Sequence, residues 1–210
     1  MTYTGDERLA MCDTFAEVGP DHPTLAGSWT THDLIAHLIV RERRPDASLG
    51  ILLRPLAGLT EKARQQVLTK PYEQLVESFR KGPPIWTWSA IPLVGDRANL
   101  FEFYVHHEDI RRADDHWQPR PHDDRREQAL WGGLRTMGKL MFRKSPVGVV
   151  LSPAERDEIT VRKGDRLVHL VGEPSEIALV AFGRPTDRTR VVIQGDPPDI
   201  AAFEASPRGI

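Results

Sequence analysis

The chain has 210 residues, of which 40% are hydrophobic and 28% charged, and its formal net charge is −2. This balance is typical of a soluble globular protein and argues against a polyanionic partner such as nucleic acid. The single cysteine, Cys12, excludes an intrachain disulfide and fits a reducing compartment. The N-terminus lacks the pattern of a signal peptide, and no apolar run reaches the roughly 18 residues of a membrane span. We therefore expect a cytoplasmic protein with no membrane contact.

Two amphipathic helices are predicted in the first 44 residues. The first spans Asp6 to Val18 and ends at Gly19-Pro20. The second begins after an N-cap at Thr30 or Thr31 and carries Asp33 in its first turn. Their expected buried positions are Leu9, Ala10, Cys12, Phe15 and Ala16 in the first helix, and Leu34, Ile35, Leu38 and Ile39 in the second.

Cys12 and His37 each have two readings in these helices. Cys12 is either a reactive thiol or a buried small apolar residue, the usual place of a free cysteine. His37 lies at the rim of the buried face and is either a satisfied half-buried residue or a metal ligand. His32 points well away from His37 and is expected to face solvent.

The next stretch contains an irregular connection, a long helical segment and an aromatic loop. Residues 45–59 hold two prolines and two glycines, which favours irregular structure. Thr60 to Lys81 has helical character, and Pro71 must kink it or divide it. The loop that follows carries Trp86 and Trp88, which could line a ligand pocket or cover the core.

The stretch Ala98 to Ala113, ANLFEFYVHHEDIRRA, is predicted to form one helix. Glu102 and His106 are one turn apart, so their side chains project in nearly the same direction and could bind one ion. An isolated pair of this kind is also common as a solvated helix pair. The polar stripe to which they belong comprises Asn99, Glu102, His106, Asp109 and Ala113, and the apolar stripe beside it comprises Leu100, Phe103, His107 and Ile110.

Two further polar residues of this stripe have candidate roles. Asp109 could accept a hydrogen bond from a ligating imidazole, or form an exposed ion pair with Arg112. Asn99 could contact a metal-bound water or a substrate, or face solvent near the helix start. His107 points to the apolar side and is expected to pack or to support the ligands.

The character of the sequence changes near residue 145. Asp123 to Phe142 is predicted to be amphipathic helix, with Leu130, Leu134 and Leu140 among its inward residues. Three glycines in it, Gly132, Gly133 and Gly138, either weaken the helix or mark close packing. Later residues form β-branched alternating runs around one helix, EPSEIALVAFGR, and Lys163-Gly164-Asp165 predicts a tight hairpin. We expect an α+β protein with a helical bundle over residues 1–145 and a small β/α domain over 146–210.

The motifs WTTHDLIAHL and EFYVHHEDIRRA, together with the small C-terminal β/α unit, resemble the mycothiol-dependent maleylpyruvate isomerase family of actinobacterial proteins. The resemblance implies a DinB-like metal-binding four-helix bundle followed by a shortened sterol-carrier-like domain. It also implies a divalent-ion site made of His37, Glu102 and His106. An arginine of the C-terminal domain should reach the active site, and Arg184 is the candidate, although several arginines lie nearby.

Two imidazoles and one carboxylate suit Zn²⁺, with Ni²⁺, Fe²⁺ or Mn²⁺ as alternatives, and leave a coordination position open. The resemblance implies mycothiol as the thiol cosubstrate of an isomerase or S-transferase acting on a small electrophile, and it leaves a homodimer open. The thiolate would add to an electrophilic carbon of the substrate. The alternative is a non-catalytic, metal-stabilised protein that binds a small molecule.

Overall fold

The computed structural model describes residues 2–44, 57–84, 87 and 92–209. It is an α+β protein that divides into two compact units, Met1–Pro119 and Arg120–Ile210, each described here by itself. The sequence predicts a domain boundary near residue 145. The structure puts it before helix α7 (Asp124–Met141), because that helix packs on α8 (Pro174–Ala181) of the second unit. Among the described residues, no helix has both the length and the apolar character that a membrane crossing needs.

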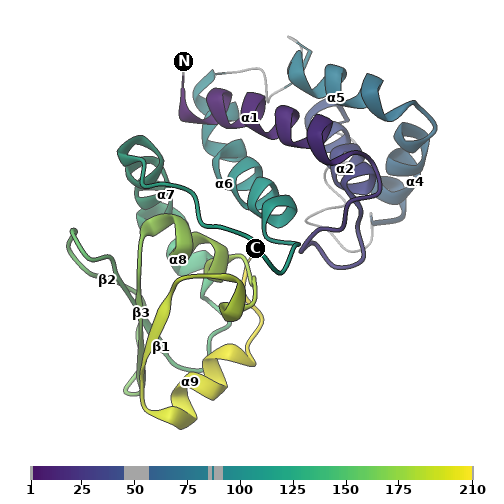
Figure 1. Ribbon diagram of the computed structural model, residues 1–210. Helices are drawn as coiled ribbons and strands as arrows, with labels where there is room; N and C mark the ends of the chain where they lie inside the picture. Colours follow the sequence, from purple (N-terminus) through teal and green to yellow (C-terminus); the bar gives the residue numbers. More distant parts are fainter. Residues whose placement is uncertain (1, 45–56, 85–86, 88–91, 210) are drawn as a thin grey trace. The chain divides into compact units, whose positions relative to one another are not determined.

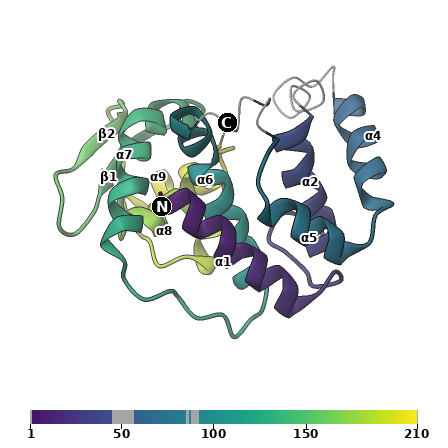
Figure 2. The same cartoon turned by 90° about the horizontal axis from the view of Figure 1, so that it is seen from above.

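The first unit is helical (Figures 1 and 2). Helix α1 packs on α5 and α6, and helix α2 packs on α4 and α5. These helices therefore enclose one core rather than forming independent hairpins. Their bounds are α1 Tyr3–Val18, α2 Thr31–Arg43, α4 Ala57–Leu68, α5 Tyr72–Arg80 and α6 Pro92–Arg111.

The start of α2 is fixed at Thr30, one of the two N-cap residues that the sequence predicts. The hydroxyl of Thr30 accepts a hydrogen bond from the backbone N–H of Asp33, and the Asp33 carboxylate accepts one from the Thr30 N–H at 3.2 Å. Such a reciprocal cap satisfies two N–H groups that a helix start would leave without partners. This cap sets the register of the face that carries His37.

Two other helix boundaries lie at proline residues. Pro71 divides the third segment, as one of the two predicted outcomes, since α4 ends at Leu68 and α5 begins at Tyr72. Helix α6 begins at Pro92, earlier than the predicted Ala98. The helix thus includes Gly95 and Asp96, and proline is well suited to the first helical turn because it needs no N–H partner there.

The core of the first unit is aromatic and aliphatic. Phe15 meets Tyr72 and Phe79 edge-to-face at centroid distances of 6.4 and 6.5 Å. The inward face of α1 differs in part from expectation, since Leu9 is 37% exposed and Met11 is fully buried. The buried members of the core are Met11, Cys12, Phe15, Leu34, Ile35, Leu38, Ile39, Tyr72, Leu75, Val76, Phe79, Phe103 and Ile110.

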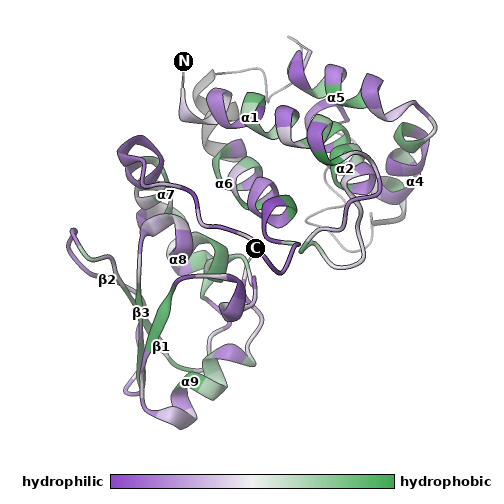
Figure 3. Ribbon diagram, viewed as in Figure 1, coloured by the Kyte–Doolittle hydropathy of each residue, from purple (hydrophilic) through white to green (hydrophobic). Residues whose placement is uncertain are grey.

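The second unit contains a four-stranded sheet with the order β2-β1-β3-β4. Strand β1 pairs antiparallel with β2 and parallel with β3, and β3 pairs antiparallel with β4. Hydrophobic residues concentrate on β1 (Figure 3), which is buried along its whole length. The strands are β1 Gly148–Ser152, β2 Ile159–Arg162, β3 Leu167–Val171 and β4 Val192–Gly195, and a 3-10 turn covers Thr186–Arg188.

The predicted hairpin at Lys163-Gly164-Asp165 is wrong, although the two strands that flank it are present. Strands β2 and β3 lie on opposite sides of β1, so the connection passes the beginning of β1. Gly148 and Gly164 permit that passage, because a Cβ on Gly164 would lie 2.8 Å from the Gly148 nitrogen. The two glycines therefore serve a backbone crossing rather than a tight turn.

Helices α7, α8 and α9 accompany the sheet in the second unit. Close approach explains one glycine of α7, since a Cβ on Gly138 would lie 2.6 Å from Val161 Cγ1, whereas Gly132 meets open space. Leu140, expected inward, is 45% exposed. Helix α9, Pro197–Glu204, was not predicted, and it packs on β3 and β4 while Phe203 stacks on Phe142 at 6.1 Å.

Candidate metal centre

The three residues expected to bind a metal ion come together in the first unit. His37 projects from α2, and Glu102 and His106 project from successive turns of α6. One donor atom from each lies within 4.8 Å of the other two. The carboxylate oxygen Oε2 of Glu102 is 3.9 Å from His37 Nε2 and 3.5 Å from His106 Nε2. Residues more than sixty positions apart in the chain thus present their donor atoms to one point.

This arrangement fits a divalent transition-metal ion. Ligand atoms about 2.1 Å from a tetrahedral ion lie roughly 3.4 Å from each other. The separations of 3.5 and 3.9 Å between the carboxylate oxygen and the two imidazole nitrogens are close to that value. Two imidazoles and a carboxylate form a donor set that borderline divalent ions accept. The residues present therefore fit the divalent ion that the family resemblance implies.

His106 is held in a ligand-ready orientation by Asp109. Its Nδ1–H donates a hydrogen bond of 2.9 Å to Asp109 Oδ2, and Asp109 is fully buried. This bond fixes the tautomer and leaves Nε2 directed at Glu102. The predicted acceptor role of Asp109 is confirmed, and an exposed ion pair is excluded because the carboxylate has no exposed surface.

His37 is positioned chiefly by aromatic neighbours. Its ring lies 5.1 Å from the indole of Trp29 and 5.4 Å from the imidazole of His106, which it meets nearly at right angles. The guanidinium carbon of Arg64 lies 5.6 Å from the ring centroid of Trp29. Trp29 is not among the site residues predicted from the sequence. The local feature that could have indicated its role is its position directly before the N-cap residue Thr30.

Arg41 is a second residue that sequence reasoning missed. It is one turn beyond His37 on α2, and its Nε lies 3.5 Å from Glu102 Oε2. Its Nη1 donates to the side-chain oxygen of Asn99, and Asn99 donates in turn to Glu42 Oε1 at 3.4 Å. The alternative that Asn99 faces solvent is wrong, since only 2% of it is exposed. Its observed contacts are with Arg41 and Glu42, and a contact with substrate stays a prediction.

The three ligands differ in how their surroundings shift proton affinity. Burial lowers the pKa of His37 below its usual value, against the opposing effect of Glu102. Burial alone would raise the pKa of Glu102, but the neighbouring His106, His37 and Arg41 hold it well below its usual value. Burial alone would lower the pKa of His106, but Asp109 and Glu102 outweigh it and raise that pKa to about 9. Glu102 and His37 are therefore ready to bind a cation near neutral pH, whereas His106 must first lose a proton.

His107, adjacent to the proposed ligand, belongs to a different cluster. Its Nδ1 is 2.7 Å from Glu7 Oε1 and its Nε2 is 2.8 Å from Thr14 Oγ1. Tyr3 donates from its hydroxyl to the other Glu7 oxygen at 3.0 Å. The expectation that His107 packs against its neighbours is confirmed, and its ring nitrogens face α1 rather than the metal centre.

The remaining sequence candidates lie elsewhere. Trp86 and Trp88 are outside the described residues. Arg184 is in the second unit, where its guanidinium donates to the Phe182 carbonyl at 2.8 Å. Cys12 is fully buried, and burial raises its thiol pKa to about 11, so the reading as a reactive thiol loses support. His32, expected to face solvent, instead meets the Tyr72 ring edge-to-face at 5.6 Å.

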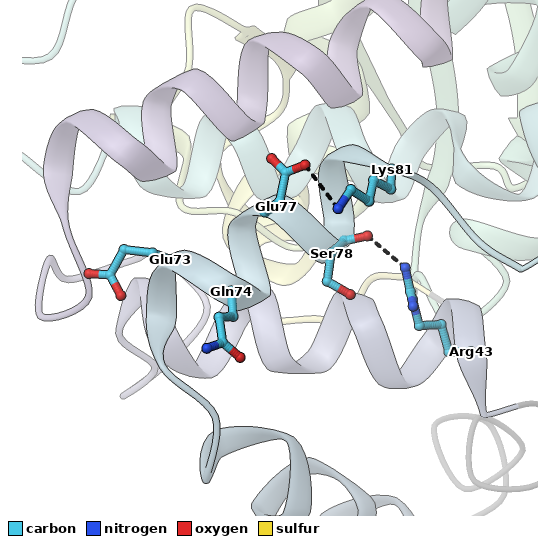
Figure 4. A pocket seen from close by; sticks show the side chains of 6 residues that line it. All are labelled: Arg43, Glu73, Gln74, Glu77, Ser78 and Lys81. Atoms are coloured by element: carbon cyan, nitrogen blue, oxygen red, sulfur yellow. Dashed lines mark hydrogen bonds and ion pairs between the residues drawn. The ribbon is translucent and has the colours of Figure 1, made fainter.

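A hollow of about 410 Å³ lies between α2 and α5, away from the ligands (Figure 4). Arg43 donates there to the carbonyls of Ser78 and Gly82 at 2.6 and 2.9 Å, and Lys81 pairs with Glu77 at 3.3 Å. These contacts cap the end of α5 with positive charge, a common structural use of basic side chains. None of the proposed metal ligands lines this hollow.

Comparisons of the chain with protein-family models, with curated proteins and with solved structures found no match. The family resemblance drawn from the two helix motifs therefore stays a prediction. The geometry of His37, Glu102 and His106 is the basis for a functional proposal.

Proposed function

We propose that the chain binds one divalent transition-metal ion through His37, Glu102 and His106 and uses it in a thiol-dependent isomerisation or S-transfer on a small electrophile. The supporting observation is the convergence of the three donor atoms to within 4.8 Å of one another. Zn²⁺ is the first candidate, because two imidazoles and one carboxylate are a common set of three protein ligands at catalytic zinc sites. Ni²⁺, Fe²⁺ and Mn²⁺ are the alternatives.

Three protein ligands leave a coordination position for an exogenous group, which is what separates catalytic from structural sites. A bound divalent ion lowers the pKa of a thiol near it, so that thiolate is present around neutral pH. The chain's own residues hold that ion in place: Asp109 orients His106, and Trp29 packs beside the His37 ring. Preorganised ligands of this kind need little rearrangement when the ion binds.

The thiol is proposed to come from outside the protein. The only cysteine in the sequence is Cys12, which is fully buried and has its pKa raised to about 11 by burial. A thiol of this kind is protonated near neutral pH and out of reach of a substrate. A low-molecular-weight thiol is therefore the natural nucleophile, and mycothiol is the one that the family resemblance implies.

The finer architecture belongs to the same proposal. We propose that the first unit is a DinB-like bundle and the second a shortened sterol-carrier-like domain. The resemblance names Arg184 as the arginine that takes part in the reaction. The α+β composition and the place of the ligands on two helices are compatible with this assignment.

The test begins with the purified protein, its metal content, and its reaction with mycothiol and two electrophiles. One electrophile should be a cis-alkene conjugated to carbonyls, which reports isomerisation, and the other an aryl halide, which reports thiol transfer. We expect one equivalent of metal, and a thiol-dependent product that is lost in His37→Ala. His116→Ala is the matched control, because His116 is an exposed histidine of the same unit.

Two possible results would contradict different parts of this proposal. Metal bound without any thiol-dependent product would favour the alternative, a non-catalytic, metal-stabilised protein that binds a small molecule. A His37→Ala variant that still holds a full equivalent of metal would remove His37 from the site and overturn the proposed centre.

A further inference from the structure

We propose that Arg64 is a positioning residue of the metal centre. It holds the indole of Trp29 against the imidazole of His37, so that helix α4 supports a ligand that α2 supplies. The inference rests on the proposed function, because it concerns how the proposed centre keeps one of its ligands oriented for the ion. It gives Arg64 no contact with the ion or the substrate.

The first support is that the two imidazoles are oriented in different ways. A metal-binding histidine usually donates a hydrogen bond from its second ring nitrogen, as His106 does to Asp109 at 2.9 Å. Within the described part of the chain, no hydrogen bond of this kind orients His37, and Glu102 Oε2 lies 3.9 Å from its Nε2. Its ring lies instead 5.1 Å from the indole of Trp29, with the two planes at 46°. The direction of the His37 ring therefore depends on packing against Trp29.

The second support is the place of Trp29 itself. It is half-buried and directly precedes the N-cap of α2. Its main chain is held, since its carbonyl accepts a hydrogen bond of 2.8 Å from the Thr24 hydroxyl. The indole is restrained by its neighbours, among them Arg64, whose guanidinium carbon lies 5.6 Å from the ring centroid. That separation is within the range of a cation–π contact, so Arg64 favours one placement of the indole.

The third support is that Arg64 is fixed by carboxylates from two helices. Its Nε and Nη2 donate to the two oxygens of Glu61, on its own helix α4, at 2.9 and 2.7 Å. Its Nη1 donates to Asp33 Oδ1, while Oδ2 of the same carboxylate closes the cap at Thr30. The Arg64 side chain is only 12% exposed. A guanidinium bound in this way keeps a constant position relative to the turn that carries Trp29.

The three contacts form one chain of support from α4 to the metal centre. Helices α2 and α4 pack on each other (Figures 1 and 2), and Arg64 connects α4 to the beginning of α2. Supports of this kind around a ligand affect metal affinity because they decide whether the donor atom is already in place. Arg64 should therefore affect Zn²⁺ affinity through Trp29 and the orientation of His37.

The test measures Zn²⁺ affinity of the intact protein by chelator competition. Arg64→Met removes the charge and keeps much of the length, whereas Arg64→Lys keeps the charge and removes the fork. Trp29→Leu removes the ring, Trp29→Phe keeps one, and the double variant Arg64→Met with Trp29→Leu completes a cycle. The matched control is Arg80→Met, because Arg80 also joins two helices, through its ion pair of 2.7 Å with Asp13.

We expect Arg64→Met and Trp29→Leu each to weaken Zn²⁺ binding about tenfold, the lower end of the loss that outer partners of metal ligands cause. The double variant should bind within about twofold of Trp29→Leu, because Arg64 acts through Trp29. Trp29→Phe should stay within about threefold of the parent, since it still presents a ring to the imidazole. Arg64→Lys should lose less affinity than Arg64→Met, and Arg80→Met should match the parent.

The sign of the Arg64→Met effect separates geometry from charge. Removal of a positive charge near a cation site by itself strengthens cation binding, so a loss of affinity must come from the orientation of the ligand. Unchanged or tighter Zn²⁺ binding in Arg64→Met would overturn the inference while the proposed function stands. So would additive losses in the double variant, which would indicate a structural effect independent of Trp29.

Two further results keep the test decisive. Urea denaturation in a chelator shows whether each variant is folded, and if Arg64→Met is not, Arg64→Lys and the two Trp29 variants decide. Parent-like affinity in Arg64→Lys, or equal affinities in Trp29→Leu and Trp29→Phe, would then contradict the inference. A parent protein that fails to bind Zn²⁺ would overturn the proposed function, and the inference with it.

Discussion

Helix α6 carries two adjacent histidines whose surroundings differ in a way that separates a ligand site from a structural contact. His107 has both ring nitrogens within hydrogen-bond distance of α1, at 2.7 Å from Glu7 and 2.8 Å from Thr14. His106 has one nitrogen bonded to Asp109, and the other lies 3.5 Å from Glu102, too far for a strong hydrogen bond but suited to a shared ion. Both histidines lie beside carboxylates, but the contacts with Glu7 and Thr14 already occupy both ring nitrogens of His107.

The exposed fractions of the side chains separate the His106 cluster from the His107 cluster in the same way. The side chains of His107 and Glu7 are each 4% exposed, whereas those of His106 and Glu102 are 14% and 24% exposed. A ligand must be able to reach a metal centre, and a structural pair between packed helices has no such need. Spacing in the sequence alone cannot distinguish these two cases, because the partners of His107 come from another helix, α1.

The largest expected effect comes from replacing the histidine of the open cluster. His106→Gln removes a ligand nitrogen, so metal affinity should fall by more than the roughly 10- to 100-fold that loss of an outer partner causes. Chelator competition measures this directly. The matched variant His107→Gln should keep metal affinity within about threefold. Equal losses in both variants would erase the distinction between the two clusters.

The second effect is the pH dependence of metal binding. Asp109 and Glu102 raise the pKa of His106 to about 9 against the effect of burial, so near neutral pH the ion must displace a proton from it. Metal affinity should therefore rise about tenfold per pH unit up to about pH 9 and then level off. The pKa values of His37 and Glu102 are lowered, so neither adds a second proton in that range. A flat profile between about pH 7 and 9 would show that His106 is not the residue that releases the proton.

The third effect concerns stability and belongs to the closed cluster. His107→Gln cannot occupy both Glu7 and Thr14 as the imidazole does, and a buried carboxylate that loses a partner is costly. The free energy of unfolding should fall by about 2 kcal/mol, measured by urea denaturation in a chelator. The same substitution at His106 should change stability less under those conditions, since that side chain is more exposed. A larger loss for His106→Gln would reverse the structural assignment of the two residues.

The sequence was informative about the residues that share a helix. The register of α6 placed Glu102 and His106 together and gave Asp109 as one possible partner of His106, because positions three and four apart meet on any helix. The cap at Thr30 and the division at Pro71, each one of two predicted alternatives, depend on the same kind of local pattern.

The parts that failed depend on contacts between distant segments. Arg41 and Trp29 were missed because nothing in their own helix or loop shows that they face Glu102 and His37. The glycine at 164 resembles a hairpin turn locally, and only the position of β1 between β2 and β3 shows that it serves a crossing. Local patterns thus predict elements well and partners poorly.

The smallest expected effect extends the comparison to a histidine–carboxylate cluster in solvent. His122 lies 2.7 Å from Glu173 and 3.1 Å from Asp124, and these two carboxylates raise its pKa to about 9. A raised pKa in the folded state means that the stabilisation is complete below the unfolded value near 6.5 and is lost as the pH rises through about 9. His122→Gln should therefore lose less stability than the parent over that interval, by a small margin because the imidazole is 52% exposed and water screens the pair. Thermal melting of both proteins at the two ends of the interval measures the difference. Identical pH slopes would mean that the ion pairs of this cluster contribute nothing in solution, whereas a difference as large as that of His107→Gln would mean that exposure is a poor guide to which histidine pairs matter in this protein.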